Sequence, residues 1–353
     1  MDNAAHTLCG LALARAGLDR FGAAATVTTV IAANLPDLDI VVHPLLGKTG
    51  YLCYHRGITH ALLGLGVESL LLAAAVWFVV RQWHPDARWT PLWGCAALGL
   101  ASHVGLDALN TYGVRPFLPF SGRWYYGDAA FIMEPWIWLG FGFAACAGSP
   151  SALTRKTRNA WLMWSSVVFT LLSFSGRAPL WTAAVWVLGM GGALYLRRGP
   201  LSERARRRAA WAGLALAALY PLALTLPLNR SAGARAGIAV AALGEPVLSQ
   251  TVHPSPAAPW RHRAVVSTQR QVYVVEVDLL AGTLEVGEPL ARNLELPQQL
   301  GLTTLDEYRA WRDFAREPFV APIGSDAVIL GDARYVPEAV DAWCNFEVAL
   351  PGE

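Results

Sequence analysis

Histidine and aspartate residues recur in the first 110 residues of the chain, within or beside long apolar stretches. The most regular pair is His103 and Asp107, which are four residues apart, so that one face of a helix would carry both side chains. Two further aspartates flank one leucine in the stretch PDLD, and two histidines lie in HRGITH. The pattern predicts a metal site with seven candidate ligands: His6, Asp37, Asp39, His55, His60, His103 and Asp107.

The types of these side chains indicate which ion the site would take. A single aspartate after a helix is commonly a turn former, and a single intramembrane histidine is as often a packed residue as a ligand. Several carboxylates gathered at low dielectric, however, repel one another unless a cation compensates them. A mixed nitrogen and oxygen set favours zinc, with manganese and iron as alternatives. Seven donors exceed the four that one zinc ion takes, so the pattern permits one ion or two.

Other polar residues near these ligands are candidates for catalysis and substrate binding. Arg56 lies within HRGITH, and a guanidinium can hold a phosphate group through two parallel hydrogen bonds. Asp128 and Glu134 open the next apolar stretch, so they join Arg56 as candidate catalytic residues. Arg123 and Asn110 are the predicted substrate-binding residues, and Asn110 continues the helical stripe of the preceding histidine and aspartate.

The composition is that of a membrane protein. Hydrophobic residues make up 54% of the 353 positions and charged residues only 15%, whereas soluble domains carry about a quarter charged residues. The five cysteines form no CxxC pair, which excludes zinc-finger and redox motifs. Basic residues flank apolar segments and form no single patch, so no nucleic acid partner is expected. The predicted partners are membrane lipids and a small-molecule or lipid substrate, and the oligomeric state stays open.

Long apolar runs indicate how often the chain would cross a membrane. Five runs are long enough to span, and three more are shorter or interrupted. The five are 60–80, 91–109, 159–176, 179–196 and 209–228, and the weaker ones are 4–18, 21–35 and 129–147. We therefore expect a mainly α membrane protein, a polytopic helical bundle of about seven to eight membrane segments with a small C-terminal α+β soluble domain.

Basic residues are divided unequally between the loops of such a bundle. One set of loops carries 13 lysines and arginines, and the alternate set carries five. The positive-inside rule assigns the richer set to the cytoplasm. Both termini, the C-terminal domain and all seven candidate ligands then fall on the outer side, which supports a shared site.

Charge also divides the chain along its length. Residues 1–230 hold 19 Lys and Arg against 10 Asp and Glu, whereas residues 231–353 hold 9 against 16. We interpret 1–230 as a polytopic membrane domain that carries the metal site. Residues 231–262, rich in Ala, Gly and Pro, are predicted to be a linker. Residues 263–353 begin with the strand-like alternation RAVVSTQRQVYVVEVD and are predicted to form a small extracytoplasmic α+β domain.

The motifs PDLD, HRGITH, SHVGLDALNTYGVRPFLPFS and DAAFIMEP together resemble the membrane-bound metal-dependent hydrolase family of YdjM type, bacterial inner-membrane proteins. The resemblance covers roughly residues 3–140. It implies that the seven candidate ligands correspond to the family's conserved positions. Relatives often carry Asp-Pro where this chain has Glu134-Pro135, so the carboxylate is kept with one more methylene.

The expected function is therefore that of a membrane-bound metal-dependent hydrolase at the outer face of the bacterial inner membrane. A phosphoester or lipid-linked substrate, attacked by a metal-bound hydroxide, fits a site in the plane of the membrane surface. Two alternatives stay open. A divalent-cation transporter also needs histidine and aspartate within helices, and a non-catalytic membrane protein would use the metal only for stability.

Overall fold

The computed structural model describes residues 1–146, 167, 180–198, 202–335 and 343–350, and these form two compact units. The first unit consists of residues 1–38, 58–226 and 256–259, and we call it the helical unit. The second consists of residues 39–57, 227–255 and 260–353, and we call it the mixed unit. Each unit therefore contains segments that are far apart in the sequence.

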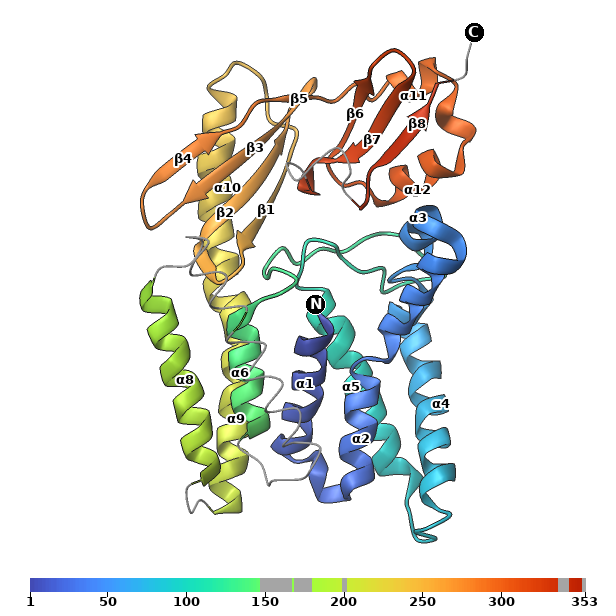
Figure 1. Cartoon of the computed structure of the whole chain (residues 1–353), viewed down its shortest axis with the longest axis vertical. Coiled ribbons are helices and arrows are strands. Elements are labelled where there is room, and N and C mark those ends of the chain that lie inside the picture. Colours follow the sequence, from blue (N-terminus) through green and yellow to red (C-terminus); the bar gives the residue numbers. More distant parts are fainter. Residues whose placement is uncertain (147–166, 168–179, 199–201, 336–342, 351–353) are drawn as a thin grey trace. The chain divides into compact units, whose positions relative to one another are not determined.

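The helical unit is built from helices that run roughly along one direction (Figure 1). Short 3-10 turns follow several of them, and a π-helical segment, η4, continues α9. Its elements are α1 (Asn3–Ala16), η1 (Leu18–Phe21), α2 (Ala23–Ala32), η3 (Ile58–His60), α4 (Leu62–Val80), α5 (Trp89–Asp107), α6 (Pro135–Cys146), α8 (Leu180–Arg198), α9 (Glu203–Leu219) and η4 (Tyr220–Thr225). The 3-10 segment η2 (Leu35–Val41) begins in this unit and ends in the other.

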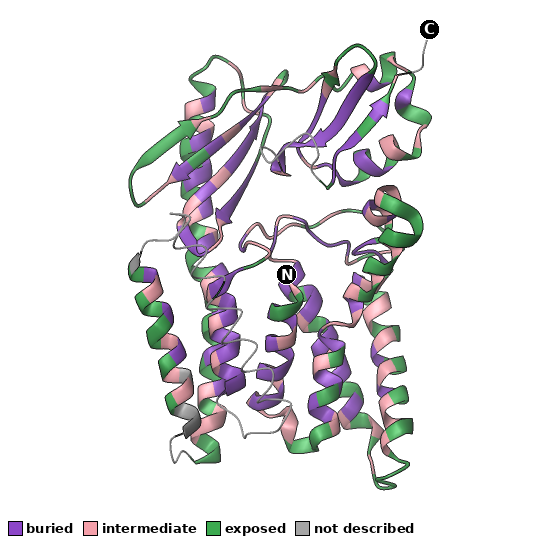
Figure 2. Cartoon of the chain, in the orientation of Figure 1, coloured by how far each residue is buried: buried purple, intermediate pink, exposed green. Residues whose placement is uncertain are grey.

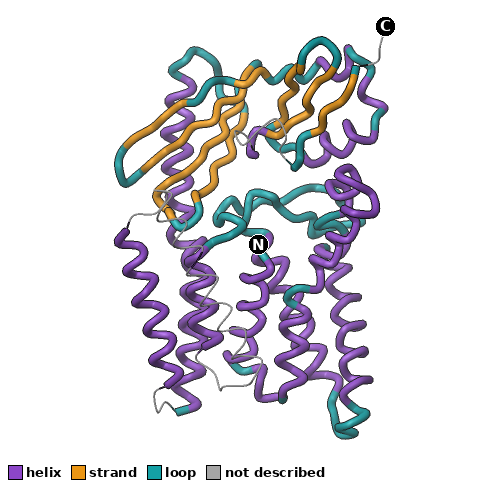
Figure 3. The backbone as a smooth tube through the Cα atoms, viewed as in Figure 1, coloured by secondary structure: helices purple, strands orange, loops and turns teal. Residues whose placement is uncertain are grey.

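The mixed unit combines strands with short helices, as the orange and purple segments of Figure 3 show. Its helices are α3 (Val42–Tyr54), α10 (Leu226–Ala241), α11 (Leu296–Gln299), η5 (Leu302–Thr304), α12 (Asp306–Phe314) and η6 (Ala333–Tyr335). Its strands are β1 (Ser249–Ser255), β2 (Ala258–Ser267), β3 (Gln271–Asp278), β4 (Thr283–Val286), β5 (Leu290–Ala291), β6 (Pro318–Ile323), β7 (Ala327–Asp332) and β8 (Phe346–Ala349).

The strands form two sheets whose apolar faces are buried. The larger sheet has the order β1-β2-β3-β4, with β5 also paired to β3, and the smaller sheet has the order β6-β7-β8. On one face of the larger sheet, Val275 packs with Ala236 and Val240 of α10. Val265 and Phe319 belong to a second apolar cluster, which joins the larger sheet to the smaller one. The alternation seen from residue 263 onward is that of strands buried on one or both faces.

The expectation of seven to eight membrane segments is wrong. Among the described residues, two helices are long and apolar enough to cross a membrane, Leu62–Val80 and Glu203–Ala241. A third span results only if Ala23–Ala32 and Leu35–Tyr54, which are bent against each other, count as one. The remainder of the described chain is a mixture of shorter helices and antiparallel strands, so the protein is not a polytopic bundle of the predicted kind.

Helix length is the physical reason for this correction. A helix needs about 20 apolar residues to cross the hydrocarbon core. The runs 4–18, 21–35 and 129–147 fold into helices of only 14, 10 and 12 residues. The run 91–109 forms a 19-residue helix, but it does not combine that length with a sufficiently apolar composition. The expected segment 159–176 lies outside the described residues, apart from position 167.

The region expected to be a linker contains regular structure. Residues 231–262 hold most of α10, all of β1 and the first half of β2. The abundant small residues of α10 allow it to lie close to the sheet, where Ala232 and Ala236 are fully buried.

Close packing of α5 against α2 positions the polar end of α5. Gly99 of α5 lies against α2 so tightly that a Cβ atom there would be 2.6 Å from the Cβ of Ala32 and 2.7 Å from the carbonyl oxygen of Thr29. Gly10 of α1 allows a similar approach to Val30 and Ala33. His103 lies one turn beyond Gly99, and its Nδ1 is 2.8 Å from the carbonyl oxygen of Ala33. The glycine contact therefore fixes where the imidazole lies.

This contact makes Gly99→Ala a damaging substitution. The added methyl group clashes with backbone atoms of α2 that have no free rotation, and overpacking of this kind costs about 1–3 kcal/mol. We expect the thermal midpoint of the detergent-purified protein to fall by several degrees. Gly94→Ala is the matched control on the same helix, since a Cβ there would meet nothing within 4 Å. Equal midpoints for the two variants would contradict the role assigned to Gly99.

Candidate metal centre

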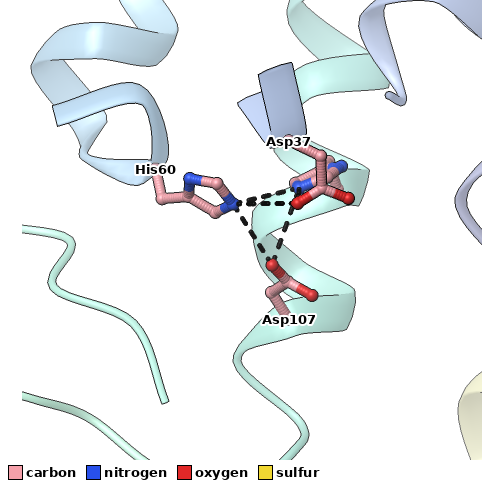
Figure 4. A group of neighbouring side chains, drawn as sticks. Asp37, His60 and Asp107 are labelled. Atoms are coloured by element: carbon pink, nitrogen blue, oxygen red, sulfur yellow. Dashed lines mark hydrogen bonds and ion pairs between the residues drawn. The ribbon is translucent and has the colours of Figure 1, made fainter. Parts of the chain in front are cut away.

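Four side chains from three separate segments of the helical unit converge on one point (Figure 4). Asp37 lies in η2, just after α2, and His60 ends η3. His103 and Asp107 are one turn apart at the C-terminal end of α5. Each residue offers one ligand atom, and these four atoms all lie within 4.8 Å of one another.

The distances between these atoms are short and nearly uniform. The Nε2 atoms of His60 and His103 are 3.1 Å apart. Asp37 Oδ1 lies 3.7 Å from Nε2 of His60 and 3.5 Å from Nε2 of His103. Asp107 Oδ2 lies 3.3 Å and 3.6 Å from the same two nitrogen atoms. A tetrahedral ion with bonds of about 2.0–2.1 Å separates its ligands by roughly 3.3–3.4 Å. The donor set therefore has the size of one tetrahedral coordination shell.

Hydrogen bonds to the other ring nitrogens orient both imidazoles. Nδ1 of His103 contacts the carbonyl oxygen of Ala33, which only accepts hydrogen bonds, so Nδ1 carries the hydrogen and Nε2 carries the lone pair. Nδ1 of His60 lies 3.0 Å from the hydroxyl oxygen of Thr59. Such partners are typical of histidines that bind metals through the opposite nitrogen. Both Nε2 atoms thus face the centre as potential ligands.

Burying these side chains together is electrostatically unfavourable without a cation. His60, His103 and Asp107 have side chains with no exposed surface, whereas the side chain of Asp37 is 16% exposed. Two carboxylates and two nitrogen lone pairs that meet in a buried place repel one another unless a positive charge lies between them. The cluster could therefore hold a metal ion, and its one partly exposed member is Asp37.

His6 lies directly beside the four donors. Its ring stacks on that of His103 with 3.8 Å between the centroids. Its Nε2 lies 3.4 Å from Oδ1 of Asp107, the carboxylate oxygen that does not point at the other histidines. The amino group of Met1 contacts the same oxygen. The N-terminal helix is held in register by Asp2, which caps it by accepting from the backbone N–H groups of the fourth and fifth residues.

Asp39, His55 and Arg56 belong to the mixed unit. Nδ1 of His55 lies 2.6 Å from Oδ1 of Asp39, and the backbone N–H of Arg56 donates to Oδ2 of the same carboxylate at 2.9 Å. The ring of Tyr51 stacks on His55 with 4.6 Å between the centroids. The structure therefore joins these expected ligands to each other, and within the helical unit it gathers Asp37 with partners from η3 and α5.

The expected substrate-binding residues have local roles in the loop that follows α5. Asn110 is fully buried, and its Oδ1 accepts from the backbone N–H groups of Tyr112 and Gly113 at 2.9 and 3.3 Å. The guanidinium of Arg123 lies over the ring of Tyr125, 5.4 Å from its centroid. These contacts shape the loop between α5 and α6.

The expected catalytic acids lie in the same connection. Asp128 has a left-handed backbone, with φ of 53°, directly before Ala129, whose N–H donates to the carbonyl oxygen of Leu109. Glu134 is fully buried and lies 3.4–3.5 Å from the backbone N–H groups of Ala257 and Trp136, which donate to its Oε1. Burial raises the pKa of Glu134 to about 8. Glu134 is therefore a neutral carboxyl group at neutral pH.

Two partners of the cluster were not anticipated from the sequence. The hydroxyl of Thr59 lies against Nδ1 of His60. The carbonyl oxygen of Ala33 orients His103, and a backbone group of an alanine leaves no signal in the sequence. Only the packing of α2 against α5 reveals it.

Comparisons with known proteins give a family match. The model of the family described as YdjM inner membrane protein matches residues 1–182. The uncharacterized protein YfhP of Bacillus subtilis (strain 168) is 28% identical over 147 residues, which cover 39% of this chain and 43% of that protein. The chain thus aligns with less than half the length of this curated relative. No solved structure matches the chain.

The buried carboxyl group of Glu134 predicts a pH dependence. Its pKa in the folded protein, about 8, exceeds the ordinary value of 4.5, so folding favours the protonated form. This stabilisation is complete below about pH 4.5 and is lost as the pH rises toward 8. Glu134→Gln keeps a neutral side chain of the same shape. We expect this variant to lose less thermal stability than wild type between pH 5 and pH 8, and to melt at least about 3 °C higher at pH 8.

Glu203→Gln is the control for this measurement, because the side chain of Glu203 is 62% exposed at the start of α9. It should follow the wild-type pH profile. If the melting temperature of Glu134→Gln changed with pH as that of wild type does, Glu134 would be ionised in the folded protein.

Proposed function

Because the chain belongs to the YdjM family of inner membrane proteins, we propose that it is a membrane-bound metal-dependent hydrolase whose ion is held by His60, His103 and Asp107, with Asp37 at the open side of the same cluster. The observation that carries the proposal is that the two imidazole nitrogens lie 3.1 Å apart and each lies 3.3–3.7 Å from both carboxylate oxygens, distances close to the edge of a tetrahedral shell. Two imidazoles and two carboxylates favour zinc, with manganese or iron as alternatives.

A divalent ion in this position would act as a Lewis acid that lowers the pKa of a bound water and neutralises charge developing on a substrate. His60, His103 and Asp107 are fully buried, and we assign them to holding the ion. Asp37 lies at the partly exposed side of the cluster, so a substrate and water would approach there. We assign Asp37 to accepting a proton from the attacking water. A carboxylate at that edge can contact the attacking water and can then release the proton to bulk solvent.

The proposed substrate class is a phosphoester, either soluble or linked to a lipid. Location in a membrane favours an amphiphilic substrate. In the reaction, the water oxygen forms a bond to phosphorus, the ester P–O bond breaks, and the released alkoxide takes up a proton. Arg123, which is exposed in the loop after α5 of the same unit, is the guanidinium group that we propose for a phosphate oxygen.

A structural metal is the alternative that the geometry favours next. Four protein donors can close a tetrahedral site completely, as structural zinc sites do. The two functions differ in what Asp37 does: a structural site needs it for binding the ion, whereas a hydrolytic site needs it for turnover.

Metal content tests the donor set. We expect about one ion per chain in the detergent-purified protein, measured by elemental mass spectrometry. Asp107→Ala, His60→Ala and His103→Ala should each lower this content at least about tenfold, because each leaves a buried site with one ligand fewer. His84→Ala is the control, since this histidine lies in the exposed loop between α4 and α5. Equal metal in all four variants, or none in wild type, would contradict the proposed centre.

Asp37→Asn separates catalysis from structure. We expect the variant to keep about one ion per chain while phosphoester hydrolysis falls by about 10²–10⁴-fold, the usual contribution of a general base. The measurement is turnover of a chromogenic phosphodiester alongside metal content. Loss of the ion together with activity would make Asp37 a ligand only. Metal retained by a wild-type protein that hydrolyses no phosphoester would favour the structural alternative.

A further inference from the structure

The helical unit contains a concave region that the metal centre does not use. It is a groove of about 1120 Å³ between the start of α2, the end of α4, the loop that joins α4 to α5, and the start of α5. This volume is slightly above the usual range of about 300–1,000 Å³ for small-molecule sites. Its walls are apolar and include small residues, among them Ala24 and Ala75. The wall residues Val27 and Val79 are still 41% and 49% exposed, so the groove is open at the surface.

The groove lies along a candidate membrane span. α4 meets the length and hydropathy needed to cross a bilayer, and only Ser69 and Ala73 of its residues are buried within the protein. Figure 2 shows α4 as mostly exposed and intermediate. An apolar helix with so little protein cover has hydrocarbon as its natural surrounding. A groove that opens beside it would therefore face lipid.

Tryptophans surround the end of α4 at which the groove lies. Trp77 donates through Nε1 to the carbonyl oxygen of Ala87 at 2.9 Å, which ties the loop to the span. Trp89 and Trp93 stack with 5.9 Å between their centroids at the start of α5, and Trp83 lines the groove itself. Tryptophan is enriched at the level of the lipid headgroups. The groove is thus at a membrane–water interface, with its apolar walls toward the hydrocarbon side.

The rim of the groove is positively charged. Arg88 is one of its lining residues, and the guanidinium of Arg20 lies over the ring of Phe21, another lining residue, at 4.6 Å. Arg81 lies over the ring of Trp77 at 4.4 Å. Asp86 is the acid among the lining residues. Three guanidinium groups beside one carboxylate favour an anionic ligand.

We propose that this groove binds an anionic phospholipid, with an acyl chain against Ala24, Val27 and Val79 and the phosphate of the headgroup near Arg20 and Arg88. Apolar walls, a surrounding of tryptophans and a cationic rim in one place match the three parts of such a lipid. A second copy of the chain is a poorer occupant, because a symmetric contact would bring two sets of the same arginines together.

This site is separate from the metal centre. Leu92, in the groove, and His103, in the metal centre, are 11 residues apart on α5, which is about 16 Å of helix. The lipid in the groove is therefore a bound partner of the protein and is not the molecule positioned for hydrolysis. The proposal does not depend on whether the protein is an enzyme.

Lipid binding to the detergent-purified full chain tests the proposal. Native mass spectrometry with added phosphatidylglycerol or phosphatidylcholine counts the lipids that stay bound. We expect about one phosphatidylglycerol per chain and at least about fivefold weaker retention of phosphatidylcholine. Arg20→Gln and Arg88→Gln should each weaken phosphatidylglycerol binding about fivefold, the effect of one basic residue at a membrane surface.

Two tryptophan substitutions on α4 test the place of binding. Val79→Trp fills the groove and should abolish the bound lipid, whereas Leu71→Trp, at a 65% exposed position of α4 outside the groove, should leave it unchanged. Val27→Trp repeats the test from α2 if Val79→Trp fails to fold. Equal lipid binding by the groove and control variants would overturn the site. Equal binding of both lipids would overturn the headgroup assignment, and a dimer that Val79→Trp dissociates would show a second chain in the groove.

Discussion

The repulsion between Asp37 and Asp107 is the constraint on which the rest of the helical unit depends. Their carboxylate oxygens converge with the Nε2 atoms of two histidines at a point where three of the four side chains have no exposed surface. Positive charge offsets this repulsion, whether it comes from an ion at the centre, from protons on the histidines or from the amino group of Met1, which contacts Asp107. η3 and α5 end at this point and η2 passes it, and a bound ion would offset the electrostatic repulsion among the side chains that they bring together. The cluster is therefore the candidate metal site, and it is also the place where three segments of the helical unit meet.

The scaffold positions His103 through a backbone contact. α5 approaches α2 closely enough for His103 to reach the carbonyl oxygen of Ala33, and this approach requires glycine at position 99. That hydrogen bond fixes the tautomer of the imidazole and so presents a lone pair to the centre. The glycine at position 99 therefore allows the hydrogen bond that selects the tautomer of His103.

The chain has fewer membrane-crossing helices among its described residues than its hydropathy suggested. Short helices such as α1 and α6 use their apolar residues to pack within the helical unit, whereas α4 presents most of its surface outward. A small number of exposed spans is still enough to hold the unit in a membrane. The two ends of α5 therefore differ in chemistry. An apolar groove with arginines lies at its start, and the histidine–aspartate centre lies at its end.

Local patterns in the sequence were sufficient for the family and for the four converging side chains, Asp37, His60, His103 and Asp107. The i, i+4 spacing of His103 and Asp107 requires only a helix, and PDLD and HRGITH are recognisable without any knowledge of packing. Strand alternation likewise identified β2 and β3 from residue 263 onward. Tertiary structure alone decided which ligands meet, because Asp37, His60 and His103 come from three segments that are far apart in the sequence. It also decided the number of spans, since an apolar run in the sequence does not fix how many of its residues a single helix contains.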